Sequence, residues 1–220
     1  GNREQLAELI VHALEQVGNG RTGEIDAIKI VKQKGSAIED SELVHGLILD
    51  KEAANESMPK KIEGGKILLV DFALELRSPE TETKISVSTP DQLQQFIASE
   101  EYALREMTKK IISSGANIVF CQKGIDDVAQ YYLAKEGIMA YRRIAKSDME
   151  KLAGATSGKI VSSLHEIKNE DLGFAEIVEQ VKKGDDTMTY VRGCKNPKAV
   201  TILLRGSTDH VLDEIERAVK

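Results

Sequence analysis

The sequence has no tryptophan, only two cysteines and only 4% aromatic residues. No apolar run approaches the ~18 residues that a helix needs to cross a membrane, so we expect neither a transmembrane segment nor a membrane partner. Cys121 and Cys194 lie far apart in apolar surroundings, which favours two buried free thiols over a disulfide. Because free thiols are typical of reducing compartments, we expect a cytoplasmic protein.

Charge and motifs exclude several further classes of protein. The formal net charge of -6 argues against nucleic-acid binding, since proteins of that class usually present a net basic surface. The sequence has neither a P-loop nor a GxSxG nucleophile elbow. None of its four histidines has a second histidine or a cysteine at metal-ligand spacing. We therefore expect no metal site and no catalytic residue of these types.

A few charged residues leave an enzymatic alternative open. Asp126 and Asp127 are adjacent, and adjacent side chains on a helix point in different directions, so they favour a helix start over an acid–base pair. The basic cluster that begins at Arg142 favours a solvated strand end over an anion site. The alternative is a small-molecule or anion-binding α/β enzyme domain, anchored by Arg142, Arg143, Ser207 or Thr208.

The hydrophobic pattern predicts the alternating helices and strands of an α/β protein. Helices are expected at 3–17, 90–113, 125–135, 147–155 and 207–220. Strands are expected at 25–35, within 41–52, and at 65–76, 116–121, 138–143, 159–164, 186–194 and 199–206. Ser147 and Glu150 predict a capping box, and Gly137 is expected to end the third helix. The polar segment 78–91 is expected to form an exposed loop.

The long helix at 90–113 has an apolar stripe in two parts. Thr89 is its expected N-cap, with Pro90 as first residue and Gln92 completing a capping box. The rear part of the stripe comprises Leu104, Met107 and Ile111. Glu100 and Glu101 interrupt it, and it resumes near the helix start with Leu93, Phe96 and Ile97. A helix with a packed rear and an isolated apolar tip is expected to project from its domain.

The helix at 125–135 has more apolar surface than one packed face needs. Its expected apolar face comprises Ile125, Val128, Ala129, Tyr132 and Leu133. Tyr131 falls beside that face, together with Gln130 and Lys135. Half of such a helix normally belongs to the core, which is the simpler interpretation. The alternative is that it forms an apolar gripping surface together with the tip of the long helix.

Three long stretches resemble a known family. They are GLILDKEAANESMPKKIEGGKILLVDFALEL, SGANIVFCQKGIDDVAQYYLAKEGIMAYRRIAKSDMEKLAGATSGKIV and GDDTMTYVRGCKNPKAVTILLRGSTDHVLDEIERAV. Together they closely resemble the apical domain of archaeal group II chaperonins, the thermosomes, and its return into the intermediate domain. The eukaryotic cytosolic chaperonin is similar but more distant. The resemblance covers essentially the whole chain.

The resemblance implies an α/β fold with apical-domain-like β-sheet layers flanked by helices, a long helical protrusion, and an α+β partial intermediate domain. Residues 46–197 would form the apical domain, which binds substrate. Residues 1–45 and 198–220 would form two parts of the intermediate domain. The protrusion that serves as a built-in lid would span about 77–112.

The resemblance also implies a function, which is to bind unfolded or partly folded polypeptides within an ATP-driven double ring of chaperonin subunits. The family's phosphate loop lies in an equatorial domain that this sequence lacks, and the aspartate that promotes hydrolysis would align just beyond Lys220. We therefore expect this chain to be no enzyme and to bind no cofactor, with ATP and magnesium belonging to the full-length parent. The residues expected to bind substrate are Leu93, Phe96, Ile97, Val128, Tyr131, Tyr132 and Lys135.

Overall fold

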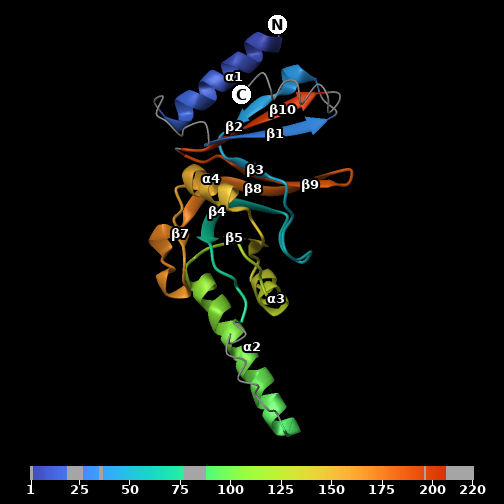
Figure 1. Cartoon of the computed structure of the whole chain (residues 1–220), viewed down its shortest axis with the longest axis vertical. Helices are drawn as coiled ribbons and strands as arrows, with labels where there is room; N and C mark the ends of the chain where they lie inside the picture. Colours follow the sequence, from blue (N-terminus) through green and yellow to red (C-terminus); the bar gives the residue numbers. More distant parts are fainter. Residues whose placement is uncertain (1, 19–26, 35–36, 77–87, 196, 207–220) are drawn as a thin grey trace.

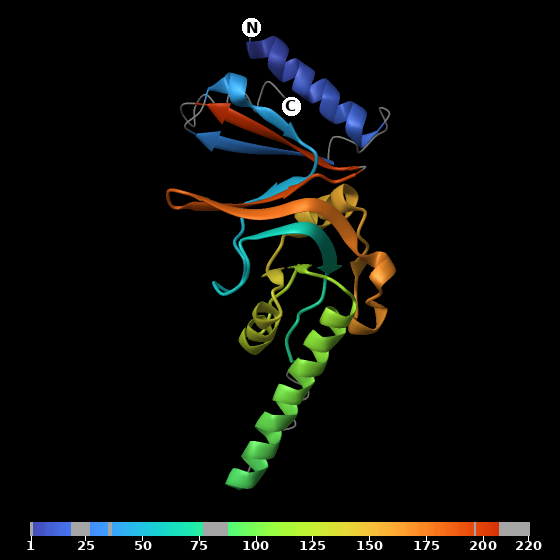
Figure 2. The same cartoon turned by 180° about the vertical axis from the view of Figure 1, so that it is seen from behind.

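The computed structural model describes residues 2–18, 27–34, 37–76, 88–195 and 197–206. The molecule is elongated, with a helix and a small sheet at one end and a large sheet in the middle (Figure 1). A long helix projects from the opposite end, and it projects equally clearly when the molecule is seen from behind (Figure 2). The α/β fold expected from the sequence is confirmed.

The small sheet pairs strands that lie far apart in the sequence. Its order is β1 (Ile28–Lys34), β10 (Val200–Gly206) and β2 (Glu42–Val44), with β1 parallel and β2 antiparallel to β10. A short 3-10 helix, η2 (Ile38–Asp40), precedes β2. Helix α1 (Asn2–Val17) packs on this sheet through an apolar cluster whose buried members are Leu6, Ala13, Val17, Val200, Ile202 and Leu204.

The large sheet has seven strands and combines parallel and antiparallel pairing. Its main order is β3 (Leu47–Leu49), β9 (Asp186–Arg192), β8 (Gly173–Lys183), β4 (Lys61–Val70), β5 (Ile118–Cys121) and β6 (Met139–Tyr141). Strand β7 (Ile160–Val161) also pairs with β4. The pairs β4–β5, β5–β6 and β4–β7 are parallel, whereas β3–β9, β9–β8 and β8–β4 are antiparallel.

Helices cover both faces of the large sheet. Successive side chains of β4 alternate between two cores, with Ile67 and Leu69 in one and Leu68 and Val70 in the other. Helix α4 (Lys146–Thr156) packs on the first core, and α3 (Asp127–Lys135) and the rear of α2 (Pro90–Ser113) pack on the second. This arrangement explains why the end of β4 reads as a continuous apolar run. The expected burial of this strand on both faces is confirmed.

Two expected elements are placed differently in the structure. The strand expected at 65–76 is β4, which begins at Lys61 and ends at Val70. The segment 41–52 forms two strands, β2 and β3, because the chain passes from the small sheet to the large one between them. The remaining expected strands are confirmed within a few residues. The helix expected at 207–220 and most of the loop expected at 78–91 lie outside the described residues.

Two sequence interpretations were wrong. Helix α4 begins at Lys146, and its N-cap residue, Ala145, makes no side-chain hydrogen bond, so the capping box expected at Ser147 does not form. Strand β8, which is 11 residues long, had not been predicted. Charged residues such as Glu176 and Glu179 interrupt its apolar pattern. Its extended conformation depends on pairing with β4 and β9, which are distant in sequence.

Between β2 and β3, where the chain passes from the small sheet to the large one, the backbone at Gly46 lies close to Val191 of β9. A Cβ atom on Gly46 would lie 1.8 Å from the carbonyl oxygen of Val191, so glycine is required there. The buried hydroxyl of Thr201 on β10 donates to the carbonyl of Gly46 at 3.1 Å and accepts from the amide of Ile48 at 3.2 Å. One side chain of the small sheet thus satisfies two backbone groups on the way into the large one.

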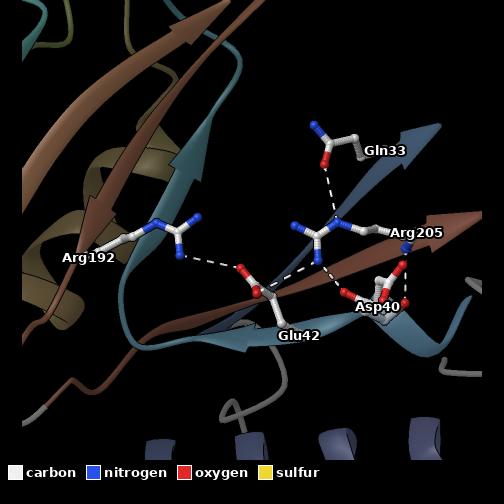
Figure 3. A network of polar contacts seen from close by, with 6 residues as sticks. Gln33, Asp40, Glu42, Arg192 and Arg205 are labelled. Carbon is white, nitrogen blue, oxygen red and sulfur yellow. Dashed lines mark hydrogen bonds and ion pairs between the residues drawn. The ribbon is translucent and has the colours of Figure 1, made fainter. Parts of the chain in front are cut away.

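An ionic network also links the two sheets (Figure 3). Glu42 on β2 lies between two arginines, at 3.3 Å from Arg192 on β9 and 3.7 Å from Arg205 on β10. Arg205 also donates to Gln33 at 3.4 Å and to the carbonyl of Asp40. The network therefore joins β9 of the large sheet to η2 and to all three strands of the small one. Because Glu42 and Arg192 are partly exposed, we expect the link to be weak in energy and to serve mainly for orientation.

Candidate functional site

The long helix α2 is buried at its rear and exposed at its front. Leu104, Thr108 and Ile111 are buried, whereas every residue from 88 to 103 is exposed. The N-cap is as expected, since the hydroxyl of Thr89 accepts from the amide of Gln92 at 3.2 Å. The side chain of Gln92 accepts at 3.0 Å from the amide of Ser88, one residue before the Thr89 amide that the expected capping box would use. The expectation of a projecting helix is therefore confirmed.

Three large apolar side chains near the start of α2 face solvent. Leu93 is 48%, Phe96 37% and Ile97 52% exposed. They continue, at helical spacing, the face that Leu104 and Ile111 bury further along the helix. We call these three residues the tip patch. Single exposed apolar residues are common on proteins, but three neighbours on one projecting turn form a surface that can bind apolar groups.

Helix α3 divides into a core side and a solvent side. Ala129 and Leu133 are buried in the core, whereas Val128 is 40% and Tyr131 58% exposed. Lys135 is also exposed and follows these two at helical spacing. We call Val128, Tyr131 and Lys135 the α3 patch. The apolar face expected from the sequence therefore combined residues of two sides of the helix, since Val128 had been grouped with Ala129 and Leu133.

The two aspartates that begin α3 serve its start. Asp126 is the N-cap, and its carboxylate accepts from the amide of Val128 at 2.9 Å. Asp127 is the first helical residue, where a negative charge complements the helix dipole. This arrangement supports the interpretation of Asp126 and Asp127 as a helix start rather than an acid–base pair.

Tyr132 joins α3 to α2 and differs in this from the other expected binding residues. Its hydroxyl accepts from Arg105 Nε at 2.9 Å and donates to the Glu101 carboxylate at 3.0 Å. Arg105 also contacts Glu101 at 3.4 Å and lies 5.4 Å from the centre of the Tyr132 ring. The hydrogen bond and the charge interaction with Tyr132 raise the pKa of the Arg105 guanidinium. Tyr132 is half-buried and engaged within the chain.

The tip patch and the α3 patch are separated by charged residues. Glu100 follows the tip patch on α2, and Glu101 beside it contacts Tyr132 of α3. The structure therefore presents two apolar areas with an ionic area between them. Sequence reasoning missed one further exposed aromatic residue, Tyr102, which is 66% exposed. Its position outside the apolar stripe of α2 was the only signal that it faces solvent.

A groove of about 980 Å³ lies beside the base of α2. Its apolar lining includes Phe72, Leu76, Met107 and Leu164. Glu75, Lys123 and His165 also line it, so both charge signs are present. Local sequence patterns do not predict this groove, because its walls come from four separate segments of the chain. Its mixed charge favours no particular small ligand.

The anion site considered from the sequence receives little support. Arg142 and Arg143 are exposed beyond the end of β6 and line a cavity of about 490 Å³. Lys51 and Lys60 also line it, together with five carboxylates, those of Asp50, Glu52, Glu56, Asp185 and Asp186. The negative charges of the carboxylates offset the four positive charges, so the cavity favours no anion. Ser207 and Thr208 lie outside the described residues.

The two cysteines are buried and free, as expected. Burial raises the pKa of Cys121 to about 11 and that of Cys194 to about 12. Both thiols therefore remain protonated near neutral pH, and neither is a nucleophile there. Within the described ranges, no group of three His, Cys, Asp or Glu side chains could hold a metal ion. Among the helices of those ranges, none has the length and apolarity needed to cross a membrane.

Comparison with known proteins shows which proteins this chain is similar to. A model of the TCP-1/cpn60 chaperonin family matches residues 1–220. The chain is 52% identical to the thermosome subunit beta of Archaeoglobus fulgidus and 53% identical to that of Thermococcus kodakarensis. Each alignment covers 99% of this chain and 41% of the relative, so the chain spans about two fifths of the length of these curated relatives.

A solved structure gives the same result at the level of the fold. The chain resembles the open-state monomer of a group II chaperonin from Methanococcoides burtonii with a TM-score of 0.76 and 40% sequence identity. The match covers 99% of this chain and 49% of that one. The two sheets and the projecting helix are therefore an arrangement known from this class of proteins.

Proposed function

The chain belongs to the TCP-1/cpn60 chaperonin family, and from this premise we propose that it binds unfolded polypeptides and supplies the lid of a group II chaperonin. The observation that carries the proposal is the tip patch, three large apolar side chains exposed on a helix that projects from the body of the molecule. A folded client hides its apolar side chains, whereas an unfolded client offers them. The tip patch therefore favours unfolded chains.

The strength of each contact follows from the apolar area that it buries. Removing apolar surface from water contributes roughly 25 cal/mol per Å², so one patch of three side chains binds weakly. We infer that the parent gains affinity by presenting several copies around a ring, because linked weak sites raise the local concentration of one another. Weak single sites also allow the client to be released. The partners proposed are thus unfolded or partly folded polypeptides and other chaperonin subunits.

We assign residues 46–197 to the apical domain and residues 1–45 and 198–220 to two parts of the intermediate domain. The separation of the two sheets supports this assignment, since the small sheet uses strands within 28–44 and 200–206 and the large one strands within 47–192. The protrusion is assigned to about 77–112, of which α2 is the described part. We assign ATP and magnesium binding to the full-length chaperonin. This chain is proposed to bind clients without hydrolysing ATP.

The expected binding residues fall into two groups. The tip patch and the α3 patch are proposed to contact clients, because both face solvent. Lys135 would add a positive charge beside Val128 and Tyr131, which suits a client segment of mixed character. Tyr132 is proposed to contribute the exposed part of its ring at most, because its hydroxyl is already bonded to Glu101 and Arg105.

The test is suppression of aggregation of a chemically denatured protein by this chain without ATP. The variant Leu93→Ser, Phe96→Ser, Ile97→Ser should lose most of the suppression, and Val128→Ser, Tyr131→Ser a smaller part. The matched control is Gln94→Ser, Gln95→Ser, Ala98→Ser, which puts three serines on the same helical turns without removing a large apolar group. Equal suppression by the tip variant and the control would contradict a binding role for the tip patch.

A further inference from the structure

The contact between α2 and α3 lies at the point where α2 leaves the body of the molecule. Leu104 is the first buried residue of the helix, and Glu101 and Arg105 lie on either side of it in sequence. Both contact Tyr132 of α3. Among the described residues before Glu101, the hydrogen bonds of α2 to side chains are local ones at its N-cap. Within the described part of the chain, this is therefore the side-chain contact to another element that lies nearest the tip of the projecting helix.

Glu101, Arg105 and Tyr132 form a closed set of three, in which each residue contacts both others. The hydroxyl of Tyr132 donates to Glu101 at 3.0 Å and accepts from Arg105 at 2.9 Å, and the arginine reaches Glu101 at 3.4 Å. The guanidinium also lies 5.4 Å from the Tyr132 ring centre. Two of these contacts join α2 to α3, and the ion pair within α2 holds the two side chains of that helix in place for them.

We propose that Tyr132 is a positioning residue, which clamps the projecting helix to α3 and so sets the direction in which the tip patch points. We call Glu101, Arg105 and Tyr132 the tyrosine clamp. The contact itself does not depend on the proposed function. Only its consequence does, namely that a lid must point in a defined direction. It assigns the hydroxyl of Tyr132 to this contact and leaves at most the exposed part of its ring for clients.

Geometry shows why a small contact matters here. The helix extends 11 residues from Glu101 back to Pro90, which is about 16 Å at ~1.5 Å per residue. A tilt of about 10° at the clamp would therefore move the helix start by about 3 Å, since the displacement grows with the length of the arm. The exposure of Glu101 and Arg105 limits the strength of the contact, so the clamp is expected to be reversible.

The sequence offers a matched pair of tyrosines for the test. Tyr132→Phe removes only the hydroxyl and leaves the half-buried ring in place. Tyr131→Phe removes a hydroxyl from the neighbouring residue, which is exposed and makes a ring contact with Tyr132 at 5.7 Å. Each variant differs from the unsubstituted chain by the loss of one hydroxyl oxygen on the same helix. Any difference between them therefore reports the role of the Tyr132 hydroxyl.

The measurement is the distance distribution between spin labels on the whole chain, attached at Gln94→Cys near the helix start and at Lys168→Cys on the body. Both sites are exposed, and the native thiols are buried and remain unlabelled. Tyr132→Phe should raise about fivefold the population of molecules in which the front of α2 has tilted away from α3. The distance distribution should broaden accordingly, because two hydrogen bonds to charged groups are lost. Tyr131→Phe should leave the distribution unchanged.

Two outcomes would overturn the clamp. One is a distance distribution for Tyr132→Phe that matches that of the unsubstituted chain. The other is loss of aggregation suppression by Tyr132→Phe with an unchanged distribution, which would make the residue a client contact. A second variant, Glu101→Gln, keeps the shape of the side chain but removes its charge, and it should give intermediate broadening. If neither the unsubstituted chain nor any variant suppresses aggregation, the proposed function is contradicted. The distance measurement would still test the clamp.

Discussion

The two halves of α2 have the same secondary structure and the same apolar spacing, yet only one is packed. In the half at 104–113, Leu104 and Ile111 are buried in the core of the large sheet. In the half at 90–103, Leu93 and Ile97 lie on the continuation of the same face and are exposed. The difference is the presence or absence of a surface opposite the helix. An apolar stripe therefore identifies a face, and the rest of the molecule decides whether that face becomes core.

This comparison also separates stability from binding. Residues of the packed half contribute to the free energy of unfolding, because unfolding exposes them. Residues of the exposed half contribute little to it, since they contact water in both states. They remain available for contacts with another chain. Each of the following changes acts mainly on the exposed half or on the core around the packed half, and should leave the other nearly unaffected.

The largest effect is expected from truncating isoleucine in each half. Ile111→Ala should lower the free energy of unfolding by about 2–4 kcal/mol, because it leaves a cavity in a closed core. Ile97→Ala should lower it by no more than about 0.5 kcal/mol, because it removes an exposed side chain. Urea unfolding followed by circular dichroism measures both. Equal losses would mean that the front half is packed in solution.

A comparable effect is expected from alkaline pH, and part of it should arise in the core on which the rear half of α2 packs. Cys121 belongs to the same core cluster as Ile111, and burial raises the pKa of its thiol from 9.0 to about 11. The unfolded chain releases this proton first, so the stabilisation is complete below pH 9 and lost as the pH rises to about 11. The loss should be on the order of 2 kcal/mol. The unfolding free energy of Cys121→Ala, measured over the same pH range, should fall less than that of the parent.

A smaller effect is expected from removing the N-cap of α2. Thr89→Ala loses the hydrogen bond to the amide of Gln92 and should destabilise the helix start by about 1 kcal/mol. Hydrogen exchange should therefore become about fivefold faster for the first amides of α2, while the rear half keeps its protection. Ser113→Ala, at the other end of the helix, is the control. Faster exchange in both halves would show that they unfold together.

The smallest effect on stability is expected from joining the two apolar stretches. Glu100→Leu replaces an exposed charge between the halves and should change the free energy of unfolding by less than about 0.5 kcal/mol. It should, however, extend the tip patch and increase the capture of unfolded protein in the aggregation assay. Glu100→Gln serves as the control for loss of charge alone. Unchanged capture by Glu100→Leu would limit binding to the original three residues.

Much of the fold could be predicted from local pattern. The start of α2 with its Thr89 cap and the strands β5, β6, β9 and β10 were expected, because caps, glycines and short apolar runs act over a few residues. Strand β8 was missed because its charged residues hide the pattern, and only β4 and β9 on its two sides make it a strand. The cap expected at Ser147 does not form because α4 begins earlier, with Ala145 at the cap position.

The sequence by itself determined which residues are apolar, which residue caps α2 and which family the chain belongs to. Tertiary structure alone decided that Ala129 is core while its neighbour Val128 faces solvent, and that Tyr132 bonds to Glu101. Periodicity depends on the geometry of one element, which every residue carries with it along the chain. Burial and hydrogen bonding between elements depend on which distant segment lies opposite, and that is known only once the chain has folded.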